Sequence, residues 1–367
     1  MRWGKRSGKD WHRSGVESHV TLLKLSVLDL VPVRTDQSSG DAIAATVSLA
    51  QEADRAGYTR YWIAEHHNMA AVAATSPPVM IAHLAAHTER IRLGSGGVML
   101  PNHAPLAVAE QFAILEAAHP DRIDLGIGRA PGSDPVTSMA LRGPAGRGDA
   151  DIENFPQYLD DVMALMEPLG VRVALRNQDY NLRATPAASS SPRMWLLGSS
   201  EYSAHLAAAK GLPYVFAHHF SGQGTAEALA IYRREFQPSE LTPEPRTFLT
   251  INAVVAETAE EAEALALPNM QLMARLRTGQ PLGPIDLVEE ATAAKMSPQQ
   301  VALVEASLKQ TIIGTPAQAA ARITDLAEKF DVDEVMVSPV ASAHRGADPR
   351  QAEARNTTLA LLAKELL

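Results

Sequence analysis

The stretch RYWIAEHH at residues 60–67 is a short apolar run that ends in a carboxylic acid and two histidines. The apolar run predicts a buried strand, and in α/β proteins the ends of parallel strands face the cleft where the chemistry takes place. A carboxylate beside two imidazole rings can hold, give or take a proton near pH 7. Adjacent histidines at a strand end are also frequent structural hydrogen-bonding groups, so the motif needs support from the rest of the chain.

Strand-like and helix-like segments alternate on both sides of this motif. We expect strands at 23–31, 60–65, 91–100, 122–128, 194–197, 213–217, 246–256 and 334–338. We expect helices at 41–56, 79–87, 105–118, 153–167, 201–210 and 225–236, a hairpin-like stretch at 171–183, and later helices beginning at Thr258 and Thr315 and at the end of the chain. Such alternation predicts an α/β fold with a parallel sheet, and eight strands is the number that closes a (β/α)8 TIM barrel.

A single barrel domain at 22–367 accounts for most of the 367 residues. Residues 1–21 are polar and basic and lack the apolar segment of a signal peptide, so we expect a disordered N-terminal extension there. The segment 268–299 is a long insertion before the last βα unit, and glycines and prolines interrupt its apolar spacing. We expect this segment to be a mobile lid.

The composition argues against several classes of protein. The chain has 33 basic and 42 acidic residues and a net charge of −9, which argues against a nucleic-acid groove. It has no cysteine, which excludes disulfides, thiolate catalysis and cysteine metal sites. No apolar run approaches the ~20 residues of a membrane span. We therefore expect a cytoplasmic protein without nucleic-acid or membrane partners.

Two strand ends carry groups that suit an anion. Ser199 and Ser200 join a strand to a helix, where free backbone N–H groups and hydroxyls form an anion site, and Ser203 lies one turn further on. Simple N-capping by Ser199 or Ser200 is an equally good interpretation. Arg129 ends another strand and suits a phosphate or a flavin edge, although an ion pair with Asp134 would explain it as well.

Glycines and histidines mark two further strand ends. Gly96 and Gly97 lie inside a strand, where glycine often allows the close approach of a flat ligand or marks a β-bulge. His219, with His218, ends the sixth strand. Four histidines at two strand ends could suggest a metal, but no carboxylate pattern on a second strand accompanies them, so we predict no metal site.

Taken together, these motifs resemble those of the bacterial luciferase-like flavin monooxygenases. The matching segments, in the family order, are 62–67, 88–101, 110–111, 126–129, 197–200 and 211–213. The resemblance is to single-subunit members of unassigned substrate rather than to the light-emitting heterodimer. It implies a (β/α)8 barrel that uses FMN, reduced by a separate flavin reductase, and O2 to oxygenate a small organic substrate through a C4a-hydroperoxyflavin. A lid that keeps water from the reduced flavin fits this chemistry.

The resemblance also assigns residues. His66 resembles the catalytic histidine, Arg129 resembles the arginine near the flavin phosphate, and Ser199, Ser200 and Ser203 fall at the phosphate-binding helix start. We place Glu65, His67 and His219 in the substrate pocket.

The glycine pair and the position of Gly128 separate this chain from the light-emitting members. Gly96–Gly97 falls where luciferases carry a non-prolyl cis peptide, which predicts a cis bond here. Light-emitting members have alanines at that pair and a cysteine at the position of Gly128, so we do not expect light emission.

Two rival functions and one assembly remain as hypotheses. A deazaflavin-dependent dehydrogenase would share the fold but needs a more basic mouth for a longer acidic cofactor tail. A non-catalytic flavin-binding protein is a second rival. The presence of His66, Arg129 and a long lid argues against it. The helices at 79–87 and 105–118 are rich in small apolar residues, and we expect them to pack against a partner in a homodimer.

Overall fold

The structure is a computed structural model that describes residues 23–367 apart from 131–133, 144–149, 177, 240–241 and 281. The predicted N-terminal extension at 1–21 lies outside the described residues. Among the helices of the described part, none is long and apolar enough to cross a membrane.

Eight parallel strands close a barrel, as the alternation predicts. Most of them are buried on both faces, as is usual for parallel strands that helices cover. The barrel strands are β1 (Lys24–Asp29), β2 (Arg60–Ile63), β3 (Arg92–Met99), β4 (Ile123–Gly128), β7 (Arg193–Gly198), β8 (Tyr214–Phe216), β9 (Thr247–Val255) and β11 (Glu334–Pro339). They are hydrogen-bonded in the order β9-β11-β1-β2-β3-β4-β7-β8, and pairing of β8 with β9 closes the ring.

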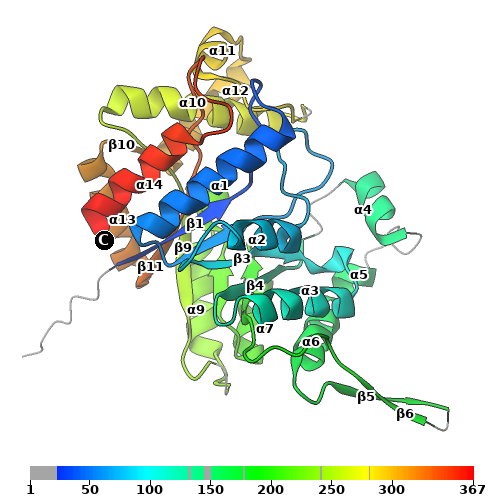
Figure 1. Cartoon of the computed structure of the whole chain (residues 1–367). Coiled ribbons are helices and arrows are strands. Elements are labelled where there is room, and N and C mark those ends of the chain that lie inside the picture. The colour runs from blue at the N-terminus through cyan, green and yellow to red at the C-terminus, as the bar shows by residue number, and fades with distance from the viewer. Residues whose placement is uncertain (1–22, 131–133, 144–149, 177, 240–241, 281) are drawn as a thin grey trace, which may run out of the picture.

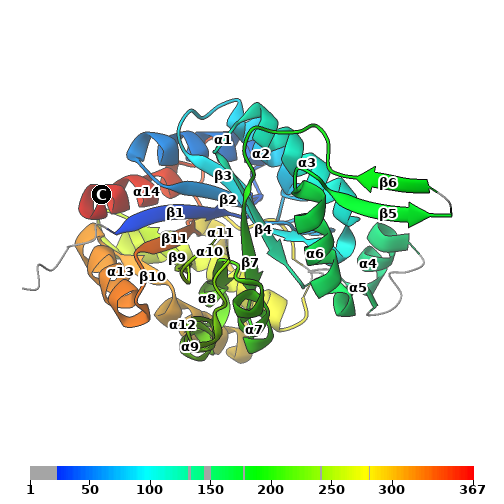
Figure 2. The same ribbon diagram turned by 90° about the horizontal axis from the view of Figure 1, so that it is seen from below.

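Helices surround the barrel (Figures 1 and 2). The outer helices are α1 (Ser39–Ala56), α2 (Pro77–Ala85), α3 (Pro105–Ala118), α4 (Pro135–Arg142), α5 (Ala150–Glu153), α6 (Phe155–Met166), α7 (Glu201–Lys210), α9 (Thr225–Glu235), α13 (Pro316–Phe330) and α14 (Glu353–Leu366). Short helices η1 (Leu100–Asn102) and α8 (His218–Ser221) follow β3 and β8. The largest hydrophobic cluster lies between the strands and this helical layer.

The amino-terminal end of the barrel is filled by a charged and aromatic plug. The buried guanidinium of Arg60 pairs with Asp124 at 2.8 Å and with Glu334 at 2.7 Å. It also lies over the rings of Trp62 and Trp195. A cavity of about 1220 Å³ opens at this end, but in barrels of this kind the amino-terminal end serves stability and the carboxyl ends of the strands carry the chemistry.

The long insertion before the last βα unit is present and mostly helical. It contains α10 (Ala259–Arg277), α11 (Val288–Ala293), α12 (Pro298–Gln310) and the short strand β10 (Ile312–Gly314), which extends the sheet beside β9. The helices α10, α11 and α12 gather at one end of the barrel (Figure 1). The predicted lid therefore begins inside a helix, because Pro268 lies within α10 rather than at its end.

Other differences from the sequence-based expectation are local. Strand β1 ends at Asp29 instead of residue 31, because Val31 adopts a positive φ of 52° and its amide turns to the Asp29 carboxylate. Helices α4 and α5 and strand β10 were not expected. The predicted hairpin is confirmed as β5 (Val171–Leu175) and β6 (Gln178–Leu182), which projects from the barrel (Figure 2).

Candidate active site

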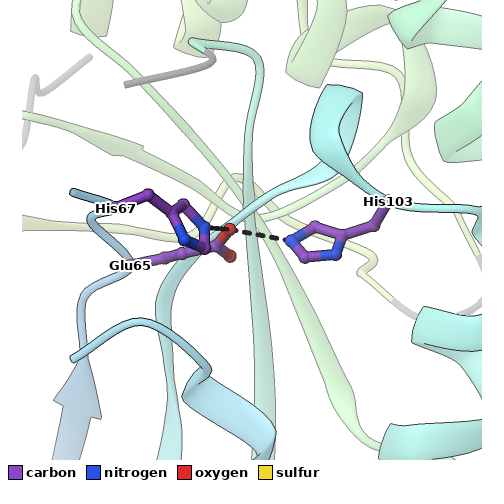
Figure 3. Close-up of side chains that lie close together, drawn as sticks. All are labelled: Glu65, His67 and His103. Atoms are coloured by element: carbon purple, nitrogen blue, oxygen red, sulfur yellow. Dashed lines mark hydrogen bonds and ion pairs between the residues drawn. The ribbon is translucent and has the colours of Figure 1, made fainter. Parts of the chain in front are cut away.

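Glu65 gathers three hydrogen bonds just beyond the end of β2. Its Oε1 accepts from Nε2 of His67 and Nε2 of His103, each at 2.7 Å, and its Oε2 accepts from the Met99 amide at 3.0 Å. Figure 3 shows both imidazole rings turned toward the carboxylate. Burial favours a raised pKa, but the hydrogen bonds and charge of His103, with those of His67 and Met99, hold the pKa of Glu65 below its ordinary value. Glu65 is therefore a buried anion that fixes two loops.

The same cluster contains donor atoms of the kind that bind transition metals. One oxygen of Glu65 and one nitrogen each of His67 and His103 lie within 4.8 Å of one another. These atoms already satisfy one another as hydrogen-bonding partners, which explains the cluster without an ion. The sequence-based expectation pairs His66 and His67 with the histidines after β8, so this grouping differs from the one weighed there.

His66 points away from that cluster into a cavity. Its backbone amide donates to the Ala74 carbonyl at 2.9 Å, which fixes the chain after β2. Its Nδ1 is buried and has no hydrogen-bond partner among the described residues, and the ring lines the cavity. Burial lowers the pKa of His66 despite the opposing charge of Glu65, with a further lowering by His67. The ring is therefore neutral near pH 7, with Nε2 as the nitrogen available to a ligand.

His219 reaches the same cavity from the end of β8. Its Nδ1 lies 2.9 Å from the Thr250 hydroxyl, and that hydroxyl in turn lies 3.1 Å from the Phe216 carbonyl. Since the hydroxyl has only one proton to donate to that carbonyl, His219 is best described as donating from Nδ1. Burial, with the nearby rings of His218 and His66, lowers the pKa of His219 to about 4. His219 thus adds a second neutral imidazole.

The cavity has a volume of about 220 Å³ and lies between the carboxyl ends of the strands and α10. Apart from the histidines its walls are mostly apolar, and α10 contributes Met270, Leu272 and Met273. The position at the carboxyl end of the barrel is where enzymes of this fold bind their substrates.

Gly96 and Gly97 lie where β3 departs from regular pairing. The peptide between them is cis, which confirms the prediction. The pairing of β3 with β4 shifts between Ser95 and Val98, so the bulge considered as an alternative is present as well. A Cβ on Gly96 would lie 2.7 Å from Leu28 Cδ1, and one on Gly97 would lie 2.9 Å from the Gly126 carbonyl oxygen. Close packing therefore requires glycine at both positions.

Arg129 lies beside the start of α7. Its guanidinium stacks over the ring of Tyr202, 4.1 Å from the centroid. The alternative partner, Asp134, instead caps α4 by accepting from the amides of Val136 and Thr137. The interpretation of Arg129 as the partner of Asp134 is thus not supported, and its guanidinium is held near the amides of a helix N-terminus.

The three serines near α7 do not play equal parts. Ser199 and Ser200 are exposed, and the Ser200 side chain makes no capping hydrogen bond. Ser203 is buried, and its hydroxyl donates to the Ser200 carbonyl at 2.6 Å and lies 3.1 Å from the Tyr214 hydroxyl. A Cβ on Gly198 would lie 2.0 Å from Ser203 Oγ, so the glycine lets Ser203 fasten the turn. Ser199 and Ser200 leave their hydroxyls at the mouth.

Two residues of the site are not indicated by the sequence pattern. They are His103, in the loop after η1, and Tyr202, in the first turn of α7. His103 is 38 residues from Glu65 in the chain, but the regular geometry of a barrel brings successive strand ends together. The position of His103 just after the third strand was the available signal.

Comparison with known proteins gives one consistent result. The family model of luciferase-like monooxygenases matches residues 23–333. A luciferase-like monooxygenase of Escherichia coli (strain K12) is 40% identical, with 86% of this chain and 91% of that protein covered. An N-acetyl-S-alkylcysteine monooxygenase of Bacillus subtilis (strain 168) is 33% identical, with 88% of this chain and 94% of that protein covered.

Solved structures show the same fold. Apo-MsnO8 is 33% identical and superposes with a TM-score of 0.80, over 94% of this chain and 99% of that one. The oxygenating constituent of 3,6-diketocamphane monooxygenase from Pseudomonas putida, a structure in complex with FMN, has a TM-score of 0.66 over 94% of this chain and 98% of that one. At 18% identity, this second likeness shows the fold alone.

Proposed function

We propose that this chain, which belongs to the luciferase-like monooxygenases and is a flavin-dependent oxidoreductase, takes FMN as its flavin, supplied in reduced form by a separate reductase. When bound, reduced FMN would supply two electrons to O2, so that one oxygen atom enters a small organic substrate and the other leaves as water. Passage through a C4a-hydroperoxyflavin stays a prediction drawn from the resemblance.

One observation carries the choice of FMN. Arg129 is held over Tyr202 beside the first turn of α7, where the exposed hydroxyls of Ser199 and Ser200 make no cap. A cation, free amides and free hydroxyls together suit a phosphate dianion. Gly96 and Gly97 lie on β3, which only β4 separates from β7 and the start of α7. Both glycines are partly exposed, so a flat ring can approach their backbone. The residues present therefore fit FMN.

His66 is the residue proposed to act on the reacting atoms. A neutral imidazole with Nε2 facing a ligand can donate a hydrogen bond from Nε2–H to developing negative charge or, in its other tautomer, take a proton from a neighbouring acidic group. His67 cannot do so from its place, because its Nε2 is bonded to Glu65. The helix α10 above the cavity would limit the entry of water, which favours oxygen transfer over the release of hydrogen peroxide.

The test first compares the affinities of different flavins and then measures how much product forms for each oxygen molecule consumed. Purified protein should bind FMN more tightly than riboflavin or a deazaflavin, as measured by quenching of flavin fluorescence. With a flavin reductase, NADH and a library of small organic compounds, at least one compound should be oxygenated in proportion to the oxygen consumed. Preference for the deazaflavin would favour the dehydrogenase, and flavin binding without any effect on oxygen reduction would favour a non-catalytic flavin protein.

A further inference from the structure

The cavity under α10 is separate from the groups proposed to hold FMN. Among the described residues that line it, none is Gly96, Gly97, Arg129, Ser199 or Ser200. Its walls come instead from the ends of β1, β8, β9 and β11 and from α10, with His66 at the side nearest β2. The cofactor candidates lie on β3, directly after β4 and in the turn between β7 and α7. The two halves of the barrel mouth thus offer two different surfaces.

Charge inside the cavity is already neutralised. Asp29 and Arg355 both line it, but they form a buried ion pair. The Asp29 carboxylate also accepts from the hydroxyls of Tyr61 at 2.5 Å and Thr46 at 2.8 Å. Arg277 is exposed at the rim and donates to the Phe220 carbonyl at 3.2 Å. Arg277 keeps its charge at the solvent-exposed rim, but a charged ligand group deeper in the cavity would lose its hydration and find only the paired charges of Asp29 and Arg355.

The remaining polar groups carry no charge near pH 7. They are the imidazoles of His66, His218 and His219, the amides of Asn252, Asn269 and Gln310, and the hydroxyls of Ser307, Thr311 and Ser338. A bare nitrogen left unpaired in a buried place costs less than an unpaired N–H, so the proton of His66 belongs on Nε2. His66 therefore offers a hydrogen-bond donor to the cavity. The other walls carry Met69, Met270 and Met273, whose flexible side chains adapt to irregular apolar shapes.

We propose that this cavity binds the substrate and that the part of the substrate inside it is compact, uncharged and mostly apolar, with one oxygen that accepts a hydrogen bond from His66. The proposal rests on the proposed function, since it supplies the substrate of that reaction. An apolar cavity of about 150 Å³ holds benzene. The 220 Å³ here admits a ring with a few further heavy atoms rather than a long chain.

Three probes of nearly equal shape test whether the cavity prefers an uncharged ligand. Acetophenone is neutral, benzoate is its anionic counterpart and 1-phenylethylammonium its cationic one. Ligand-observed NMR titrations at pH 7.5, with and without saturating FMN, should show that acetophenone binds at least about tenfold more tightly than either ion. FMN should not displace it. Equal binding of an ion, or no acetophenone binding up to about 10 mM, would overturn the proposal.

Competition between FMN and acetophenone shows whether the substrate assignment fails alone or together with the proposed function. If FMN binds and displaces acetophenone, the cavity is the seat of the flavin ring and the substrate assignment fails, while the proposed function stands. If FMN does not bind at all, the proposed function fails, and the substrate assignment fails with it.

Two variants test the position and the hydrogen bond. Met273→Lys puts a charge on the α10 wall and should weaken acetophenone binding at least about tenfold, whereas Met273→Leu, the matched control, should change it less than about threefold. In His66→Ala, the ratio of acetophenone to ethylbenzene affinity should fall by about 3- to 10-fold, because only acetophenone has the oxygen. An unchanged ratio would remove His66 from the proposal. If Met273→Lys does not fold, binding of the three probes to the wild-type protein still decides whether the cavity prefers an uncharged ligand.

Discussion

The two adjacent histidines after β2 have different surroundings, and this difference separates their roles. His67 is bonded to the buried Glu65 carboxylate, whereas His66 faces the cavity with a lowered pKa. Adjacent residues in an extended segment point to opposite sides, so only one of the two rings can face a ligand at the barrel mouth. Replacing each histidine in turn therefore tests their roles, with His67 as the control for His66.

His66→Ala should fold and bind FMN but lose oxygen transfer by about 10²- to 10⁴-fold, the range for a general acid or base. Reduced flavin should still consume oxygen and release it as hydrogen peroxide. The measurement is product formed per oxygen consumed, with a reductase supplying reduced FMN. His67→Ala should lower stability, because it leaves one bond of Glu65 unmade, and should keep more of the coupling. Wild-type coupling in His66→Ala would remove the catalytic assignment.

Arg129→Ala should weaken FMN binding by about 1.5–3 kcal/mol, the range for hydrogen bonds to charged groups. Riboflavin lacks the phosphate, so its binding should change little. Fluorescence titration of both flavins measures the difference. Arg172→Ala, which removes an exposed arginine of the β5–β6 hairpin, is the control and should affect neither. Equal losses for FMN and riboflavin would place Arg129 away from the phosphate.

His219→Gln should flatten the acid dependence of stability. The pKa of His219 is about 4 in the folded protein against an ordinary value of 6.5, so the unfolded chain takes up the proton first as the pH falls. Stability that is present above pH 6.5 is therefore lost progressively toward pH 4. The free energy of unfolding in urea should fall by about 1–2 kcal/mol less in the variant between pH 7 and pH 5. Parallel curves for the two proteins would show that His219 is not buried and neutral.

At this scale the sequence predicts single residues better than it predicts partners. Glu65 and His66 stand out because a carboxylate and histidines directly follow an apolar run. His103 does not, because its link to Glu65 exists only once the ends of β2 and β3 lie side by side. The same holds for Arg129, whose contact with Tyr202 joins two strand ends, and whose sequence neighbour Asp134 was the wrong alternative.

Helices and strands can be predicted where the spacing of apolar residues is regular. They are missed where contacts with distant parts of the chain determine the backbone conformation. Apolar runs bounded by turns locate the eight barrel strands. Strand β10, only three residues long, is a strand because it pairs with the outer part of β9. Helix α10 continues through Pro268 because buried residues on both sides of the proline, among them Leu265 and Leu272, hold the same face against the protein. Packing there outweighs the lost hydrogen bond.

The mobile part of the predicted lid should therefore lie after α10 rather than from Pro268 onward. The Arg275–Asp286 ion pair, at 2.7 Å, joins the end of α10 to the segment before α11. Within residues 23–367, trypsin should cut first after Arg277, which is exposed, and more slowly when FMN and a cavity ligand are present. Asp286→Ala should speed this cut several-fold, whereas Asp333→Ala, which removes a surface pair at the far end of the barrel, should not. A first cut elsewhere within residues 23–367, or no protection by ligand, would contradict a lid.

The two ends of the barrel differ in their side chains and in their expected roles. The Arg60 plug closes the amino-terminal end, and the carboxyl ends carry Glu65, His66 and the cavity. Closure of the ring by β8 and β9 brings His219 opposite His66, although the two are far apart in the chain. The sequence predicts the ring from the strand count, but the shape of the cavity depends on side chains of α10 that no periodicity locates.

Two neighbouring outer helices each expose a large apolar side chain, and these helices are the expected dimer contact. Helices α2 and α3 lie side by side (Figures 1 and 2), and they expose Val79 at 67% and Ile114 at 54%. An isologous interface would place these two helices against the same helices of a second copy and remove both side chains from water.

The protein should therefore sediment as a dimer at micromolar concentration, and Val79→Asp with Ile114→Asp should make it a monomer. Each new carboxylate would have to lose its hydration in the interface, and no apolar neighbour there can replace the lost water. Val136 is exposed at 70% on α4, away from these two helices, so Val136→Asp is the matched control and should leave the dimer intact. Sedimentation velocity at about 10 μM distinguishes these outcomes. A wild-type monomer would contradict the homodimer, and a dimer that persists in the double variant would place the interface on another face.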